Sequence, residues 1–274
     1  MIRLKAIIFD VDGTLANTEE IHRRSFNEAF MEFGLNHVWS VPEYTNLLAI
    51  SGGKERITAF LKSRDFSFSS DIDVRELALR IHQRKSEIYR EHLHHGRISP
   101  RPGVVRLIKE ARERGIRLGI ATSTSLANVE TLLDCILDQD ARSWFDTIVT
   151  SDIVIDKKPS PSVYQFALAR LGLSQRDCIA IEDTTNGNRA AIACGISTVI
   201  TIHEFTIDND FTGASLVVDQ LGEPDLPIRI IAGNAHGKNN VDVDLLQRIL
   251  ARQATSHKLL ATSHQDWLQP TRTD

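Results

Sequence analysis

The stretch Lys5-Ala6-Ile7-Ile8-Phe9-Asp10-Val11-Asp12-Gly13-Thr14 (residues 5–14) decides the fold. It begins as an apolar, β-branched run without helical periodicity, which predicts a buried strand over Lys5–Val11. Asp10 and Asp12 follow where this strand ends, and ligands of open α/β sheets bind beyond the carboxyl ends of strands. Two carboxylates there suit Mg²⁺, and one Asp can attack phosphorus while the other transfers protons. Taken alone, the segment predicts an ordinary Asp-Gly turn equally well.

Further along the chain, short apolar runs alternate with helical patterns, as in βαβ units. The predicted strands are Arg117–Thr122, Thr147–Thr150, Cys178–Ile181, Ser197–Thr201 and Leu216–Val218. The predicted helices between them are Val104–Glu113, Leu126–Leu137, Pro161–Leu171 and Asn188–Cys194. Nearly continuous apolar strands are typical of a parallel sheet covered on both faces. The fold class is therefore predicted as α/β, with a Rossmann-like parallel sheet core.

Residues 17–98 interrupt this alternation and carry only helical patterns. We expect helices over Thr18–Glu32, Lys54–Lys62 and Asp73–His92, followed by a Pro/Gly breaker cluster at residues 99–103. The prediction is a catalytic core of residues 1–16 and 99–225 with an inserted α-helical cap of residues 17–98. Residues 226–274 form a C-terminal extension of unknown role, with one helix expected over Val241–Leu260 and a loose tail at the end.

Three further segments place polar side chains near strand ends. Thr122, Ser123, Thr124 and Ser125 offer hydroxyls and helix-start amides to a phosphate, although a simple helix cap explains them as well. Lys158 precedes a Pro-initiated helix and could hold a cation over phosphate oxygens. Asp183 could complete a metal site with Glu182 behind it, the alternative being helix capping by Asp183 or Thr184.

The order of acid pair, hydroxyls, lysine and second acid pair resembles the four motifs of the haloacid dehalogenase superfamily of phosphotransferases. The resemblance covers about residues 1–220 and implies that Asp10 is the nucleophile and Asp12 the general acid/base. It also implies that Thr122 and Lys158 hold the phosphate, and that Mg²⁺ is bound by Asp10, Asp183 and the backbone carbonyl of Asp12. The family's helical cap matches the insert in position and character.

Within the insert, residues 18–26 and 51–57 resemble the CbbY-type sugar-bisphosphate phosphatases. That family removes xylulose 1,5-bisphosphate, an inhibitor of Rubisco, in the Calvin cycle. The residues themselves favour a second anion near Gly53, Lys54 and Arg56, because a glycine-opened helix start and cations attract phosphate. Glu19 and His22 lie on one helical face, where they could touch sugar hydroxyls, and we expect Thr124 and Ser125 to contact substrate too.

Two other enzymes and one non-enzyme remain open. A β-phosphoglucomutase-like phosphosugar mutase would use the same motifs, and a phosphoglycolate phosphatase would not need Lys54 and Arg56. A catalytically silent, phosphate-binding regulator would not need the complete set of acids and lysine. His92, His94 and His95 lack a carboxylate or cysteine partner pattern, so we expect surface residues there rather than a metal site.

Composition supports an ordinary globular protein. The 274 residues are 42% hydrophobic and 25% charged, with a net charge of −4 and no basic stripe, which disfavours nucleic-acid binding. No apolar run approaches the roughly 18–20 residues of a membrane helix. No signal peptide is visible, and the three cysteines, Cys135, Cys178 and Cys194, suit a reducing compartment. We expect a monomer in the cytoplasm, or in the plastid stroma if a transit peptide has been removed.

Overall fold

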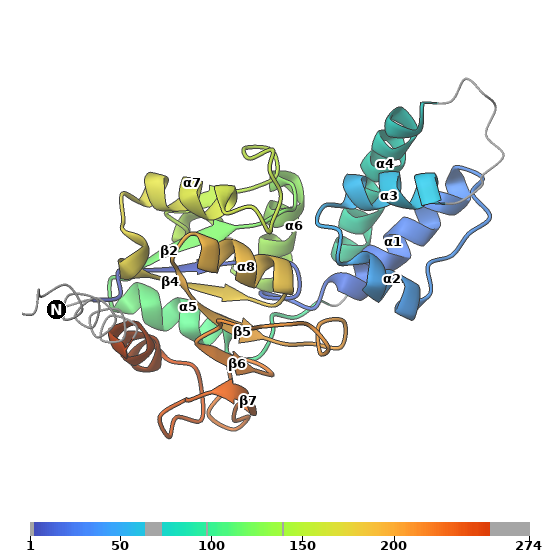
Figure 1. Cartoon of the computed structure of the whole chain (residues 1–274). Helices are drawn as coiled ribbons and strands as arrows, with labels where there is room; N and C mark the ends of the chain where they lie inside the picture. The colour runs from blue at the N-terminus through green and yellow to red at the C-terminus, as the bar shows by residue number, and fades with distance from the viewer. Residues whose placement is uncertain (1–2, 64–72, 97, 139, 253–274) are drawn as a thin grey trace, which may run out of the picture.

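The computed structural model describes residues 3–63, 73–96, 98–138 and 140–252. Within these ranges the strands form one sheet in the order β3-β2-β1-β4-β5-β6-β7 (Figure 1). Neighbouring strands are parallel, except that β7 runs antiparallel to β6. The strands are β1 (Ala6–Phe9), β2 (Arg117–Ala121), β3 (Thr147–Val149), β4 (Cys178–Glu182), β5 (Ser197–Thr201), β6 (Leu216–Val218) and β7 (Ile230–Gly233).

Helices cover both faces of the sheet because successive strand side chains point to opposite sides. In β1, Ile7 and Phe9 join the cluster that holds α5 and α6, whereas Ala6 and Ile8 join the cluster that holds α7 and α8. The first face also receives a C-terminal helix at residues 243–252. The bounds are α5 (Val104–Glu113), α6 (Leu126–Ile136), α7 (Ser162–Leu171) and α8 (Thr185–Ala193), with 3₁₀ turns at Ala141–Trp144 and Gln175–Asp177.

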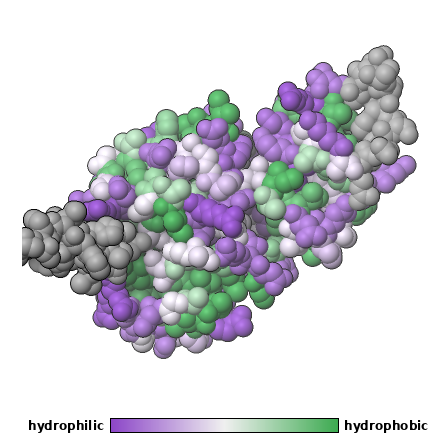
Figure 2. Space-filling model, in the orientation of Figure 1, coloured by the Kyte–Doolittle hydropathy of each residue, from purple (hydrophilic) through white to green (hydrophobic). Residues whose placement is uncertain are grey.

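The insert folds into a separate body of helices beside the carboxyl edge of the sheet (Figure 1). Its own core is aromatic, with Trp39 packed against Phe26, Phe30 and Phe60 at centroid distances of 4.9, 4.7 and 5.2 Å. In Figure 2 a narrower region joins this body to the larger one. The helices are α1 (Glu19–Glu32), α2 (Val41–Leu47), α3 (Gly53–Ser63) and α4 (Val74–His95).

Arg101 fixes the place where the chain returns from the insert to the sheet. Its guanidinium is buried and donates hydrogen bonds to four backbone carbonyls. These carbonyls come from the loop after β1, the end of β5 and the end of β6, and belong to Gly13, Thr201, Ile202 and Asp219. The arginine therefore ties the loop of the acid pair to the far half of the sheet.

The predicted fold class is confirmed. The predicted helices and strands lie within three residues of the observed ends, apart from the C-terminal helix, whose residues 253–260 lie outside the described residues, as does the predicted tail. The predictions omitted α2 and β7. No helix of the described residues is long and apolar enough to cross a membrane.

Candidate active site

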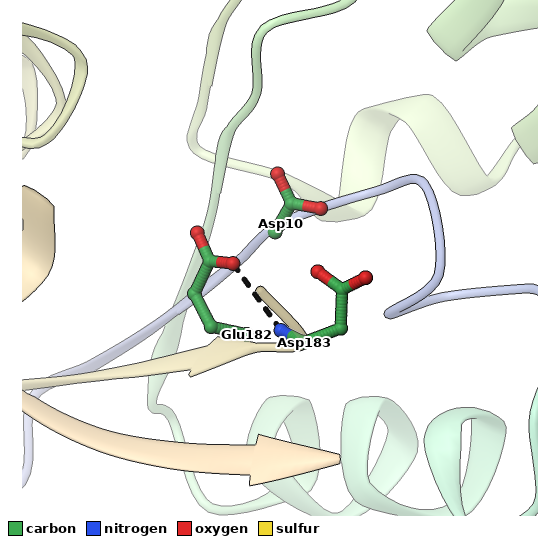
Figure 3. A group of neighbouring side chains, drawn as sticks. All are labelled: Asp10, Glu182 and Asp183. Atoms are coloured by element: carbon green, nitrogen blue, oxygen red, sulfur yellow. Dashed lines mark hydrogen bonds between the residues drawn. The ribbon is translucent and has the colours of Figure 1, made fainter. Parts of the chain in front are cut away.

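Three carboxylates converge where β1 and β4 end. The two strands pair in parallel with Phe9 opposite Ile181, so Asp10 lies beside Glu182 and Asp183. One oxygen from each carboxylate lies within 4.8 Å of the others, and all three side chains are buried (Figure 3). Burial raises the pKa of both Asp10 and Asp183, and repulsion from Glu182 raises each further. Such buried, hard oxygen donors fit a divalent cation such as Mg²⁺.

Lys158 partly compensates this negative charge. Its Nζ donates to Asp10 Oδ1 and to Glu182 Oε1, and Tyr164 Oη donates to the same Glu182 oxygen at 2.6 Å. Burial alone would lower the pKa of Lys158, but Asp10 and Glu182 outweigh it and raise the pKa. Glu182 Oε2 accepts the Asp183 amide at 3.2 Å. Both Glu182 oxygens are thus bonded within the protein, which fits a residue that supports a metal ligand rather than one free to bind.

Asp12 is turned away from this cluster toward the insert. Its Oδ1 accepts from Thr18 Oγ1 at 2.7 Å and lies 2.9 Å from His22 Nε2. On the other side of the ring, Lys85 Nζ lies 2.6 Å from His22 Nδ1, and Tyr89 stacks on the imidazole at 4.0 Å. Burial would raise the pKa of Asp12, but His22, Thr18 and Lys85 lower it to about 2.

Hydroxyl groups follow β2. Thr122 is buried at the strand end, and its Oγ1 accepts the Thr124 amide. Ser125 occupies the N-cap position of α6, yet its side chain makes no capping hydrogen bond, and Asp152 accepts the Leu126 amide instead. The simple helix-cap alternative for Ser125 is therefore wrong, and its hydroxyl is left for other contacts.

The helices of the insert supply a second group of polar side chains. Tyr44 Oη donates to Glu19 Oε2 at 2.7 Å. Arg56 is buried and donates to the carbonyls of Leu47 and Ile50, so much of its hydrogen-bonding capacity is used within the insert. Lys54 is half exposed, with Nζ 3.7 Å from Glu55. Arg56 thus shapes the segment before α3, whereas Lys54 remains accessible.

A cavity of about 320 Å³ lies between the sheet edge and the insert, and these groups surround it. Every predicted site residue except Glu182 lines it: Asp10, Asp12, Glu19, His22, Gly53, Lys54, Arg56, Thr122, Ser123, Thr124, Ser125, Lys158 and Asp183. Sequence reasoning missed further lining residues, among them Tyr44, His82, Lys85 and Lys157. Lys85 had a usable signal, because it occupies the apolar face of α4 between Ile81 and Ile88.

The three histidines at the end of α4 take no part in the cavity. His94 and His95 are exposed, and His92 Nε2 lies 2.8 Å from a Glu28 oxygen. Among the described residues, the one group of His, Cys, Asp and Glu close enough to hold a metal is Asp10, Glu182 and Asp183. The expectation of surface histidines is confirmed.

The comparisons with known proteins agree with this geometry. Residues 7–201 match the family model of the haloacid dehalogenase-like hydrolases. The plasmid-encoded protein CbbY of Cupriavidus necator is 44% identical over 85% of this chain and 92% of its own length. A CBBY-like protein of Arabidopsis thaliana is 34% identical over 80% of this chain and 70% of its own length.

A solved structure extends the likeness to three dimensions. The crystal structure of CbbY from Rhodobacter sphaeroides in complex with phosphate superposes with a TM-score of 0.74 at 41% identity, covering 79% of this chain and 94% of that one. A mutant of that protein was crystallised with xylulose-(1,5)bisphosphate. The chain therefore belongs to the haloacid dehalogenase-like hydrolases and, among them, to the CbbY-type proteins.

Proposed function

We propose that the protein is a Mg²⁺-dependent sugar-phosphate phosphatase acting through an aspartyl-phosphate, with xylulose 1,5-bisphosphate as its substrate. The single observation that carries this proposal is the cavity, which has an acid–lysine cluster on its sheet side and basic side chains on its other sides. The bisphosphate bound by the Rhodobacter sphaeroides relative supports the choice of sugar. Removal of this compound would protect Rubisco, and a location in the cytoplasm or plastid stroma follows from that role.

Asp10 and Lys158 serve the first half of the reaction. An Asp10 oxygen attacks phosphorus, and the bond from phosphorus to the sugar oxygen breaks. Lys158, held between Asp10 and Glu182, neutralises charge on the transferring phosphoryl oxygens. Mg²⁺, held by Asp10, Asp183 and the Asp12 carbonyl, would supply further charge neutralisation. Thr122 and Ser123 would hold the remaining phosphoryl oxygens.

Asp12 serves both halves as acid and base. It gives a proton to the departing sugar oxygen, then takes one from the water that attacks the aspartyl-phosphate and frees Asp10. Its low pKa keeps the carboxylate ionised, so that it can accept the proton in the base step. The acid step needs a protonated carboxyl, and a neighbouring phosphate dianion favours that form because like charge raises a pKa.

The second phosphate has a matching environment. His82 has a pKa lowered to about 3 by burial and by positive neighbours that include Lys85, Lys157 and Lys54. Burial also lowers the pKa of Lys157, and Lys54 adds to this lowering. Lys54 comes from the insert and Lys157 from the core, so an anion between them would contact both bodies. A substrate with two phosphates satisfies both ends of the cavity, whereas phosphoglycolate satisfies one.

Phosphate release from a substrate panel tests the proposal. The panel holds xylulose 1,5-bisphosphate, ribulose 1,5-bisphosphate, phosphoglycolate and β-glucose 1-phosphate, each with Mg²⁺ and then with EDTA. We expect EDTA-sensitive release with preference for xylulose 1,5-bisphosphate. Preference for phosphoglycolate would indicate a phosphoglycolate phosphatase instead. Isomerisation without phosphate release would indicate a phosphosugar mutase, and no turnover of any panel member would indicate a catalytically silent regulator.

A further inference from the structure

A short turn after β5 touches both Asp183 and the helical insert. The turn spans residues 203–206 and is closed by hydrogen bonds between its ends. The Thr206 amide donates to the His203 carbonyl at 2.9 Å, and the His203 amide donates to Thr206 Oγ1 at 3.1 Å. Because β5 pairs with β4 in parallel, this turn lies at the same edge of the sheet as Asp183.

His203 forms a directed hydrogen bond to Asp183. Its Nε2 lies 2.9 Å from Asp183 Oδ2, and both side chains are buried. The Phe205 amide donates to His203 Nδ1 at 3.3 Å, so Nδ1 carries no proton. The ring proton therefore sits on Nε2 and is donated to the carboxylate.

Gly13, in the loop that carries Asp10 and Asp12, lies directly against this hydrogen bond. Gly13 has φ of +81°, and a Cβ at that position would lie 2.2 Å from Asp183 Oδ2 and 2.6 Å from His203 Nε2. The hydrogen bond therefore lies directly against the backbone of the loop that carries Asp10 and Asp12. Thr14 Oγ1 is 3.4 Å from the other Asp183 oxygen, a much weaker restraint.

Phe205 anchors the opposite side of the turn in the insert. It is buried, belongs to the hydrophobic cluster of the insert helices, and meets the Tyr44 ring edge-on at 5.9 Å. Tyr44 in turn donates to Glu19 in the cavity. The orientation of His203 is thus set from two sides, by the turn's own hydrogen bonds and by packing against the insert.

We propose that His203 is a positioning residue that holds the Asp183 carboxylate in the orientation required to bind a divalent cation. The inference deepens the proposed function, since it takes Asp183 as a metal ligand. Hydrogen-bond partners behind metal ligands fix ligand orientation, and their loss costs about 10–100-fold in metal affinity. His203 is a residue that the sequence motifs did not point to.

Direct binding of Mn²⁺ to the whole protein, followed by electron paramagnetic resonance without substrate, tests the inference. His203→Gln keeps an N–H donor at the distance of Nε2, whereas His203→Met has a similar length and no donor. We expect His203→Met to weaken Mn²⁺ binding about 10-fold or more and His203→Gln to stay within about 3-fold of the wild type. His95→Met, on the exposed end of α4, is the matched control and should bind as the wild type does.

Three results would overturn the inference, two in the His203 variants and one in an Asp183 variant. The first is equal Mn²⁺ affinity in His203→Met and the wild type. The second is equal loss in His203→Gln and His203→Met, which would mean that the ring acts by packing. Asp183→Asn serves as the reference, and unchanged binding in it would show that Asp183 is not the ligand. Because no substrate is present, failure of the proposed sugar-phosphatase activity would leave this comparison intact.

Discussion

Asp10 and Asp12 are two residues apart, and their surroundings shift their pKa values in opposite directions. Burial and the neighbouring acids raise the pKa of Asp10, whereas His22, Thr18 and Lys85 outweigh burial and lower the pKa of Asp12 to about 2. Titratable pairs whose pKa values are pushed apart are typical of active sites in which each member has its own task. These opposite shifts support the proposal that the two residues of this short loop have different roles.

The buried Lys85 predicts a measurable pH dependence of stability. Burial lowers its pKa from 10.5 to about 7 in the folded protein. Between these values the unfolded chain binds more protons, so the free energy of unfolding rises with pH. Lys85→Met lacks this contribution. From pH of about 7 to about 9.5, we expect the wild type to gain about 3 kcal/mol over Lys85→Met in urea denaturation.

The control for that measurement is Lys109→Met, at a half-exposed lysine on α5. It should follow the wild-type profile. A difference between wild type and Lys85→Met that stays constant with pH would contradict the lowered pKa of Lys85.

At this scale the sequence predicted the part of the candidate site at the sheet edge, because its motifs follow strand ends directly. Asp10, Thr122 and Asp183 each follow a strand of the parallel sheet, so their meeting is a consequence of topology. Lys85 and His82 could not be placed in this way. They lie on α4, far along the chain, and reach the cavity only because the insert packs over the sheet edge.

Two lysines on elements that face each other across the cavity predict how the protein recognises the charge of its substrate. Lys54 lies on α3, and Lys157 lies in the loop before α7. Loss of one charge-assisted contact to phosphate costs about 1.5–3 kcal/mol, or roughly 10–100-fold in affinity. We expect Lys54→Met and Lys157→Met each to raise KM for the bisphosphate by about 10-fold, and by less for a monophosphate.

Steady-state kinetics on both substrates checks this expectation, with Arg24→Met as the matched control. Arg24 is exposed on α1, bonds Glu20 and does not line the cavity, so its variant should leave KM unchanged. An equal rise in KM for both substrates would show that neither lysine senses the second phosphate.

Two elements escaped the sequence analysis for different reasons. α2 is short and lacks a helical stripe, but Ser40 and Glu43 have the spacing of a capping box, and the Glu43 amide does donate to Ser40 Oγ at 3.3 Å. This spacing indicates a helix start, so α2 could have been predicted from the sequence. β7 is an exposed edge strand with three consecutive apolar residues before Gly233, and so short a run does not by itself distinguish a strand.

The whole molecule depends on residues that follow the predicted core. The C-terminal helix at residues 243–252 buries Leu245, Leu246, Ile249 and Leu250 in the same cluster as β1 and α5. The domain boundary predicted at residue 225 remains a prediction. For folding, part of the extension belongs to the main hydrophobic core.

Leu246→Ala tests this role. Loss of a fully buried leucine costs about 2–5 kcal/mol. We expect a drop in the free energy of unfolding of that size with kcat unchanged, measured by urea denaturation and phosphate release. Leu226→Ala, at a leucine that is 47% exposed, should be nearly neutral. Equal effects of the two variants would mean that the helix does not stabilise the core.

The central claim is that Asp10 carries the phosphoryl group during turnover. Its most direct test is rapid acid quenching during hydrolysis of xylulose 1,5-bisphosphate with Mg²⁺, followed by mass spectrometry of the peptide containing residue 10. The account predicts a phosphoryl adduct on Asp10 in the wild type, and no adduct with less than a tenth of the turnover in a folded Asp10→Asn variant. Turnover by the wild type without an adduct on Asp10, or an Asp10→Asn variant that keeps a tenth of the activity, would contradict it.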